Sequence, residues 1–247
     1  YTDPWMKTNP GMNRRRLFTA VLFAAAAAAA GAPEAEDPTL RPRRDMVRTQ
    51  IEARGIRTPA VLEAMRQTPR HLFVPPGQVR HAYEDRPLPI GHGQTISQPY
   101  IVALMTEQVE PRPNHKVLEI GAGSGFQAAV LSGIVDHVYT IEIVEPLAAW
   151  AEERLARAGC MNATVRHADG YHGWPEHAPF DAIVVTAAAP HIPPPLIEQL
   201  KDGGRMILPV GSRFRTQQLV LVEKRNGRIT TRNILPVRFV PFIRAGE

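Results

Sequence analysis

Three glycines stand at alternate positions directly after an apolar run that carries an acidic residue. The acid and the glycines are Glu119, Gly121, Gly123 and Gly125. Glycine adopts positive φ angles and lets a backbone approach a ligand closely, so the pattern predicts a buried strand, a tight binding turn and a helix N-terminus. The dinucleotide fingerprint G-x-G-x-x-G would require glycine at position 126, where this chain has Phe126. The spacing therefore argues against NAD and against a pyrophosphate ligand.

Acidic residues follow the next two predicted strands as well. Glu142 ends the run of residues 137–142 and lies 17 residues after Gly125, near the spacing of roughly 20 at which an acid binds ribose hydroxyls in nucleotide sites. Asp169, with Gly170 behind it, follows a third strand-like run and is expected to contact an adenine amino group. S-adenosylmethionine, a nucleoside ligand without phosphate, fits this set. The alternative is an ordinary strand–helix turn with acids that serve only as solvated caps.

The elements that must position these residues follow from the hydrophobic pattern. Residues 180–186 are apolar on both faces of the predicted strand, as in parallel sheets that helices cover. Helical spacing extends over residues 44–54, 59–68 and 100–108. Residues 82–100 are rich in proline, glycine and polar side chains, which predicts a functional loop rather than a regular element. The sequence thus predicts an α/β fold with a doubly wound, mostly parallel sheet and a helical N-terminal segment.

Length and composition narrow the class of protein. A chain of 247 residues with 44% hydrophobic and 21% charged residues suits one large globular domain. The net charge is +5, but the basic residues form no stripe with interleaved aromatic residues. This arrangement disfavours nucleic acid as a partner. The single Cys160 excludes an internal disulfide and a multi-cysteine zinc site, and we expect it to be a packing residue. No H-E-x-x-H spacing occurs among the histidines, so no metal is expected.

The first 45 residues differ from the rest and are expected to form an extension, so that the globular domain covers residues 46–247. Residues 12–32 combine a basic start, an apolar stretch of about 14 residues and a small-residue end, as export signals do. That stretch is shorter than the ~20 residues of a membrane-spanning helix. Residues 33–44 are proline-rich and charged, which predicts a linker. An alanine-rich extension without a targeting role and a true start at Met46 are the alternatives.

Seven short runs along the chain, taken together, form a recognisable pattern. They are residues 70–75, 85–91, 93–99, 117–125, 180–190, 203–211 and 238–241. These runs resemble those of the protein-L-isoaspartate O-methyltransferase family, from about residue 46 to residue 242. The run Gln94-Thr95-Ile96-Ser97 is more specific than the glycine turn, which many methyltransferases share. The chain departs from the family in Ala168, where glycine is usual, in Phe126, where tyrosine is common, and in its N-terminal extension.

The resemblance implies a Rossmann-like methyltransferase with a seven-stranded sheet and an antiparallel strand near the C-terminus. It implies an enzyme that uses S-adenosylmethionine to methylate the free α-carboxylate of L-isoaspartyl residues in damaged proteins and peptides, which starts repair through a succinimide. Because that carboxylate is already ionised at neutral pH, alignment and exclusion of water suffice for most of the acceleration, without a strong general base.

The resemblance, together with the spacing, assigns the site residues. Ser97 is expected to be catalytic by orienting one carboxylate oxygen of the substrate, and Asp85 is expected to orient the substrate or a loop donor. Thr95, Ile96, Val240 and Pro241 are expected to bind substrate, and Glu119, Gly121, Gly123, Gly125, Glu142, Asp169 and Gly170 to bind the cofactor. The alternatives are a helix N-cap formed by Ser97 or Gln98, a turn for Asp85 and core packing for Val240.

Two other functions stay open at this point. One is a different methyltransferase, although the amide motif that favours base methylation is missing after Thr186. The other is a catalytically silent cofactor-binding domain that serves as an interaction module. We expect a monomer, and a cytoplasmic location because S-adenosylmethionine is made in the cytosol. The signal-like residues 12–32 favour a periplasmic location as the alternative.

Overall fold

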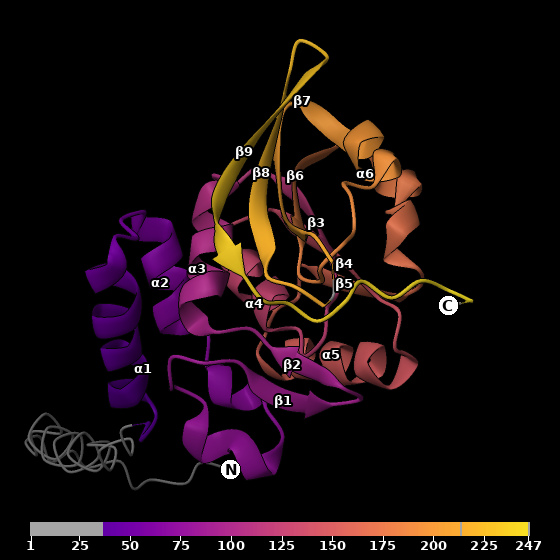
Figure 1. The fold of residues 1–247 in the computed structure, drawn as a ribbon. Helices are drawn as coiled ribbons and strands as arrows, with labels where there is room; N and C mark the ends of the chain where they lie inside the picture. Colours follow the sequence, from indigo (N-terminus) through magenta and orange to yellow (C-terminus); the bar gives the residue numbers. More distant parts are fainter. Residues whose placement is uncertain (1–36, 213, 247) are drawn as a thin grey trace, which may run out of the picture. The chain divides into compact units, whose positions relative to one another are not determined.

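The computed structural model describes residues 37–246 except residue 213, and its helices and strands lie within the unit Thr39–Glu247 (Figure 1). The α-helices are α1 (Leu40–Met46), α2 (Pro59–Gln67), α3 (Pro99–Gln108), α4 (Phe126–Ser132), α5 (Glu145–Arg157) and α6 (Pro194–Gln199). The strands are β1 (Leu88–Gly91), β2 (Gln94–Ile96), β3 (Lys116–Ile120), β4 (His137–Glu142), β5 (Ala163–His167), β6 (Phe180–Val185), β7 (Leu200–Val210), β8 (Gln217–Arg225) and β9 (Arg228–Val237).

One seven-stranded sheet has the order β5-β4-β3-β6-β7-β8-β9. The strands from β5 to β7 pair in parallel, whereas β8 pairs antiparallel with both β7 and β9. The predicted seven-stranded, mostly parallel sheet and its antiparallel strand near the C-terminus are therefore confirmed. The chain leaves β3 toward β4 and β5 and returns on the other side of β3 as β6. Ligands of doubly wound folds bind at the carboxyl ends of strands where the order reverses in this way.

Both faces of the central strands of the sheet are buried. Along β3, Val117 belongs to one hydrophobic cluster, and Leu118 and Ile120 belong to another, as the alternation of side chains along a strand requires. The first cluster includes residues of α1 to α5, and the second includes Leu196 of α6. Figure 1 shows α1 and α2 on one side of the sheet and α6 on the other. Burial on both faces explains why β6 is apolar almost throughout.

The N-terminal segment is helical, as predicted, but it begins earlier than its hydrophobic pattern indicates. α1 starts at Leu40 and continues through a π-helical turn (Val47–Ile51) and a 3₁₀ turn (Glu52–Arg54). The linker expected over residues 33–44 is therefore wrong for residues 40–44. The physical reason is that Arg43 and Met46 are buried, so the helix gains packing that its charged composition conceals.

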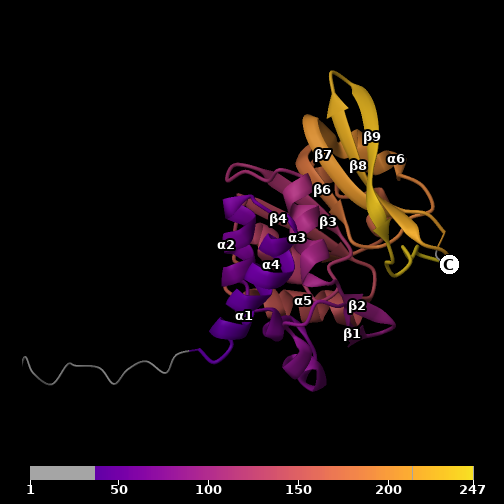
Figure 2. The ribbon, with the colours of Figure 1, turned by 60° about the vertical axis from the view of Figure 1, so that its left-hand side comes forward.

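The loop expected over residues 82–100 contains a regular element, which corrects that prediction. β1 and β2 form an antiparallel hairpin in which Leu88 lies opposite Ile96. Leu88, Ile90 and Ile96 are buried in the first hydrophobic cluster. These alternating apolar residues anchor the hairpin despite the prolines and glycines around them. In both Figure 1 and Figure 2 the hairpin lies beside α5.

The predicted cap of α3 is also wrong. Gln98 occupies the N-cap position, but no side chain caps the helix. The side-chain Nε2 of Gln98 instead donates to the carbonyl oxygen of Asp85 at 3.2 Å, and Ser97 precedes the cap position. The hydroxyl of Ser97 is thus not used to start the helix.

None of the helices between residues 37 and 246 combines the length and the apolar character needed to span a bilayer. Residues 1–36, which include the signal-like residues 12–32 and most of the expected extension, lie outside the described residues.

Candidate functional site

The turn after β3 has the conformation that its glycines predict. Gly121, Gly123 and Gly125 have φ angles of 94°, 54° and 85°. A Cβ atom at Gly121 would lie 2.5 Å from Oγ1 of Thr186, and one at Gly125 would lie 3.2 Å from Cγ of Leu155. Glycine is therefore required at both positions, for the backbone conformation and for the space around it.

The carboxyl ends of the central strands enclose a pocket, here called the strand-end cavity. Its lining includes Gly121 and Gly123 after β3, Glu142 at the end of β4, Gly170 after β5 and Thr186 after β6. The hairpin and the C-terminal segment complete the wall with Thr95, Val240 and Pro241. The fold thus brings predicted site residues from five separate segments, together with Thr186, to the reversal point of the sheet.

Glu142 is held firmly at the floor of this cavity. Its Oε2 accepts a hydrogen bond from the backbone N of Gly123 at 2.7 Å, and its Oε1 accepts one from the backbone N of Val144 at 2.9 Å. The residue is 6% exposed. Each carboxylate oxygen keeps a second acceptor site, so the side chain can also accept hydrogen bonds from a pair of ligand hydroxyls.

Glu119 and Gln127 line a smaller pocket beside the glycine turn, here called the glycine-turn cavity. Oγ1 of Thr140 donates to Oε2 of Glu119 at 2.5 Å, and Nε2 of Gln127 donates to Oγ1 of Thr106 at 2.9 Å. Within the described residues, Oε1 of Glu119 and Oε1 of Gln127 are buried without a hydrogen-bond partner. Orphaned buried acceptors are costly, and N–H donors of a ligand in this cavity would remove that cost.

The carboxyl group of Glu119 lies in an apolar environment. Burial raises its pKa to about 8, the hydrogen bond from Thr140 opposes the shift, and the charge of Glu142 adds to it. The acid is therefore largely protonated at neutral pH in the ligand-free protein. A cation placed against it would favour the ionised form.

A second opening, here called the side groove, adjoins both cavities. Its lining includes Arg54, Ser97, Tyr100 and Val240. Ser97 also lines the glycine-turn cavity, and Thr95 and Thr186 line all three openings. Oγ1 of Thr186 donates to the carbonyl oxygen of Gly121 at 2.6 Å, which fixes it against the turn. Ser97 and the two threonines thus stand where a ligand of the cavities meets a ligand of the groove.

Asp85 lies behind the side groove rather than in its lining. Its Oδ2 accepts a hydrogen bond from Nη1 of Arg54 at 3.0 Å. The guanidinium carbon of Arg54 lies 3.5 Å from the centroid of the Tyr100 ring. Asp85 is therefore joined to two residues of the groove lining, to Arg54 through its carboxylate and to Gln98 through its backbone carbonyl.

The acid–glycine pair after β5 is divided between two places. Gly170 lines the strand-end cavity, and a Cβ there would lie 2.4 Å from Cγ2 of Ile120. Asp169 accepts hydrogen bonds from the backbone N of Tyr171 at 3.0 Å and from Nε of Arg244 at 2.9 Å. Burial opposes its ionisation, but these hydrogen bonds outweigh burial and lower its pKa.

The C-terminal segment forms one wall of the strand-end cavity. The backbone N of Ala188 donates to O of Val240 at 2.8 Å, and the backbone N of Phe242 donates to O of Ala188 at 2.9 Å. Beyond them, the guanidinium carbon of Arg244 lies 3.6 Å from the centroid of the Tyr171 ring. These contacts hold the end of the chain against the residues that follow β5 and β6.

Most of the predicted site residues are brought together, and a few lie apart. Gly125 packs against α5, Asp169 bonds the C-terminal segment, and Asp85 lies behind the groove. Ile96 lines the glycine-turn cavity, but its side chain is only 3% exposed and also belongs to the hydrophobic core. Sequence reasoning missed Thr186, Gln127 and Arg54. The position of Thr186 directly after a central strand is a usable signal, whereas nothing local distinguishes the other two.

No group of three or more His, Cys, Asp or Glu side chains in the described ranges is arranged to hold a metal ion.

The chain combines a doubly wound sheet, a glycine turn that departs from the dinucleotide fingerprint at Phe126, and buried acids at the ends of neighbouring strands. This combination is typical of Rossmann-like, S-adenosylmethionine-dependent methyltransferases. The model of the family "Protein-L-isoaspartate(D-aspartate) O-methyltransferase" matches residues 41–246. The chain belongs to this family.

Individual relatives agree with the family match. The chain is 64% identical over 182 residues to "Protein-L-isoaspartate O-methyltransferase 2" of a Polaromonas species, which covers 73% of this chain and 86% of the relative. A solved protein-L-isoaspartate O-methyltransferase superposes with a TM-score of 0.74 at 30% identity, over 80% of this chain and 65% of that chain. A Plasmodium falciparum structure described as such a methyltransferase in complex with S-adenosyl-L-homocysteine has a TM-score of 0.71 at 26% identity, over 81% of this chain and 98% of that chain.

Proposed function

We infer that this chain transfers a methyl group from S-adenosylmethionine to the free α-carboxylate of L-isoaspartyl residues in damaged proteins and peptides. The ester collapses to a succinimide, which reopens in part to normal aspartate. The observation that carries this inference is that Thr95, Thr186 and Val240 line both the strand-end cavity and the side groove. A cofactor in the cavity and a peptide in the groove would meet at these residues.

The reaction is an in-line displacement at carbon. S-adenosylmethionine supplies the methyl group on a positively charged sulfur, which keeps the electron pair of the broken bond while a carboxylate oxygen forms the new one. A substrate carboxyl group titrates near pH 4, so no side chain has to remove a proton. The task of the protein is to align the two ligands and to exclude water, because opposite charges neutralise along the reaction.

The cofactor side of the site is built from acids and backbone. We assign Glu142 to the ribose hydroxyls, since both of its oxygens keep an acceptor site in the strand-end cavity. We assign Glu119 and Gln127 to the ammonium group of the cofactor, because each has an orphaned acceptor. Gly121 and Gly123 allow close approach, and Gly125 packs the turn onto α5. We assign Gly170 to the adenine, with Asp169 beside it fixed by Arg244.

The substrate side is built from the hairpin and the C-terminal segment. We assign Ser97 to orient one oxygen of the attacking carboxylate, because its hydroxyl stands between the groove and the glycine-turn cavity. Thr95 and Ile96 flank this position, and Val240 and Pro241 form the facing wall. Asp85 acts on the groove by fixing Arg54.

Methyl incorporation from labelled S-adenosylmethionine into matched isoaspartyl and aspartyl peptides tests the proposed function. We expect incorporation into the isoaspartyl peptide and little into its aspartyl control. Equal methylation of both peptides would point to another carboxyl methyltransferase. Cofactor binding without transfer to any peptide would point to the interaction module instead.

We also propose that the enzyme works as a monomer in the cytoplasm, and that the segment ahead of α1 is an extension to the methyltransferase domain, which begins with α1 rather than at residue 46. The location is supported by the cofactor, which is made in the cytosol. Light scattering of the purified chain tests the oligomeric state. Fractionation of cells that express a tagged full chain tests the location, and a periplasmic product shortened near residue 32 would overturn it.

A further inference from the structure

Arg70 is a buried cation in the middle of the segment that precedes the glycine turn. It begins the 3₁₀ turn Arg70–Phe73 and is 0% exposed. No carboxylate among the described residues forms an ion pair with it, and its Nε has no hydrogen-bond partner there. Burial lowers the pKa of Arg70 to about 9, which still leaves it charged at neutral pH. The charge of Asp85 favours the cation without forming an ion pair with it, and a buried charge without such a pair is costly, so the presence of Arg70 here calls for an explanation.

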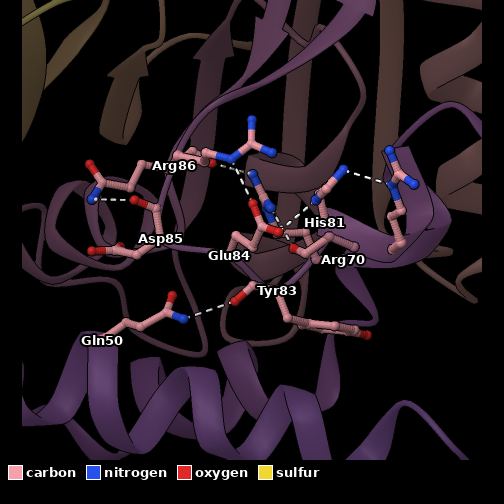
Figure 3. A network of polar contacts seen from close by, with 10 residues as sticks. Gln50, Arg70, His81, Tyr83, Glu84, Asp85 and Arg86 are labelled. Carbon is pink, nitrogen blue, oxygen red and sulfur yellow. Dashed lines mark hydrogen bonds and ion pairs between the residues drawn. The ribbon is translucent and has the colours of Figure 1, made fainter. Parts of the chain in front are cut away.

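The guanidinium is satisfied by backbone carbonyls from separate segments. Nη1 donates to the carbonyl oxygen of Ala82, and Nη2 donates to those of Arg86 at 3.3 Å and Ser97 at 2.9 Å. Ala82 and Arg86 bracket the segment that carries Asp85, and Ser97 follows the hairpin strand β2. Figure 3 shows Arg70 beside the segment from Tyr83 to Arg86.

The cofactor side of the site is also within reach of Arg70. Its guanidinium carbon lies 5.7 Å from the centroid of the Phe126 ring, and Phe126 is the first residue of α4, directly after Gly125. The rings of Phe73 and Phe126 have centroids 5.7 Å apart. The same short turn that holds the substrate-side carbonyls therefore packs against the end of the glycine turn.

We propose that Arg70 is a positioning residue for methyl transfer, which holds the Ser97 backbone and the Asp85–Arg86 segment in register with the glycine turn. This inference rests on the proposed function and on the role assigned to Ser97. The planar guanidinium suits the task because its donors point in fixed, separate directions. A lysine ammonium carries the same charge but lacks the planar fork that meets three carbonyls on two segments.

Arg70→Lys is the central test, because it keeps the charge and removes the fork. S-adenosylhomocysteine binding by calorimetry gives the number of folded, cofactor-competent sites, and single-turnover transfer to an isoaspartyl peptide gives the rate per site. We expect the rate per competent site to fall by about 10- to 100-fold, with the Kd for S-adenosylhomocysteine changed less than threefold. A merely structural role would reduce the number of competent sites and leave the rate per site unchanged.

Two comparisons make the result specific. Arg43→Lys alters another buried arginine, in α1, which lines none of the three openings described above, and its rate per site should stay at the wild-type level. In a Ser97→Ala background, Arg70→Lys should lower the rate per competent site by less than threefold, because the hydroxyl that Arg70 positions is gone. Full additivity of the two changes would show that Arg70 does not act through Ser97.

The outcomes separate this inference from the function on which it rests. Wild-type protein that binds S-adenosylhomocysteine but methylates no isoaspartyl peptide would overturn the proposed function and this inference together. If the wild-type protein methylates the isoaspartyl peptide and Arg70→Lys has the same rate per site, only the role of Arg70 is overturned.

Discussion

At the scale of single residues, Ser97 is the side chain whose removal isolates alignment from binding. We expect Ser97→Ala to lower single-turnover methyl transfer by about 10- to 1000-fold, or about 1.4–4 kcal/mol of barrier, with little change in S-adenosylhomocysteine affinity. The loss is partial because the substrate carboxylate needs no deprotonation. Ser132→Ala is a matched control, since the Ser132 hydroxyl bonds the Ala129 carbonyl within α4 and Ser132 lines none of the three openings. Wild-type turnover in folded Ser97→Ala would disprove the catalytic assignment.

Glu119 makes a prediction about pH. Its pKa rises from 4.5 in the unfolded chain to about 8 in the fold, so the native state holds a proton that the unfolded state has lost. This group therefore makes stability fall as pH rises between these values, by up to ~1.4 kcal/mol per pH unit.

Glu119→Gln is uncharged at every pH and removes this contribution. In cofactor-free protein, the melting temperature of Glu119→Gln minus that of the wild type should increase from pH 5 to pH 8, and the variant should bind S-adenosylhomocysteine more weakly. Thermal unfolding across this range checks the first part. Parallel curves for the two proteins would mean that Glu119 is ionised in the fold.

At the scale of elements, the turn between β3 and α4 joins backbone conformation to binding. Gly121 and Gly159 both have positive φ, of 94° and 75°. An added Cβ at Gly159 meets nothing within 4 Å, whereas one at Gly121 meets Thr186 at 2.5 Å. Substitutions at the two positions therefore separate the effect of backbone strain from the effect of a clash with Thr186 in the site.

We expect Gly159→Ala to cost about 1–2 kcal/mol of stability, the strain of a left-handed alanine, without changing S-adenosylhomocysteine affinity. Gly121→Ala should cost more and should weaken binding at least tenfold, because Thr186 and the turn must move apart. Chemical denaturation and calorimetry on both variants provide the measurements. Equal effects on binding would show that the space beside Gly121 is unimportant.

At the scale of the whole molecule, α1 decides where the folded unit begins. Arg43 and Met46 are buried, although the sequence places the domain boundary at residue 46. A chain that begins at residue 37 should keep the full melting temperature of the methyltransferase unit. A chain that begins at residue 46 loses the packing of Arg43, which we estimate at about 1–2 kcal/mol, or roughly 2–8 °C. Identical melting temperatures for the two chains would favour the boundary at 46.

The amino-acid sequence by itself determined the central architecture and the main chemistry of this protein. The runs 117–120 and 137–142 predict strands that end near an acid, and the run 180–186 is apolar almost throughout, as a strand buried on both faces must be. The glycines after the first run predict a turn with positive φ, and the structure has it. The acids Glu119 and Glu142 could be placed at strand ends because chain order alone sets that position in a doubly wound sheet.

Tertiary structure alone decided the features that depend on segments far apart in the chain. The hairpin of residues 88–96 is regular because three of its side chains reach the core, which its local composition hides. Arg70 shows no local sign of its partners, since the carbonyls that it binds lie 12, 16 and 27 residues away. Asp169 bonds Arg244 across 75 residues. Such contacts depend on how elements distant in the sequence pack together, so the spacing of residues within one segment cannot predict them.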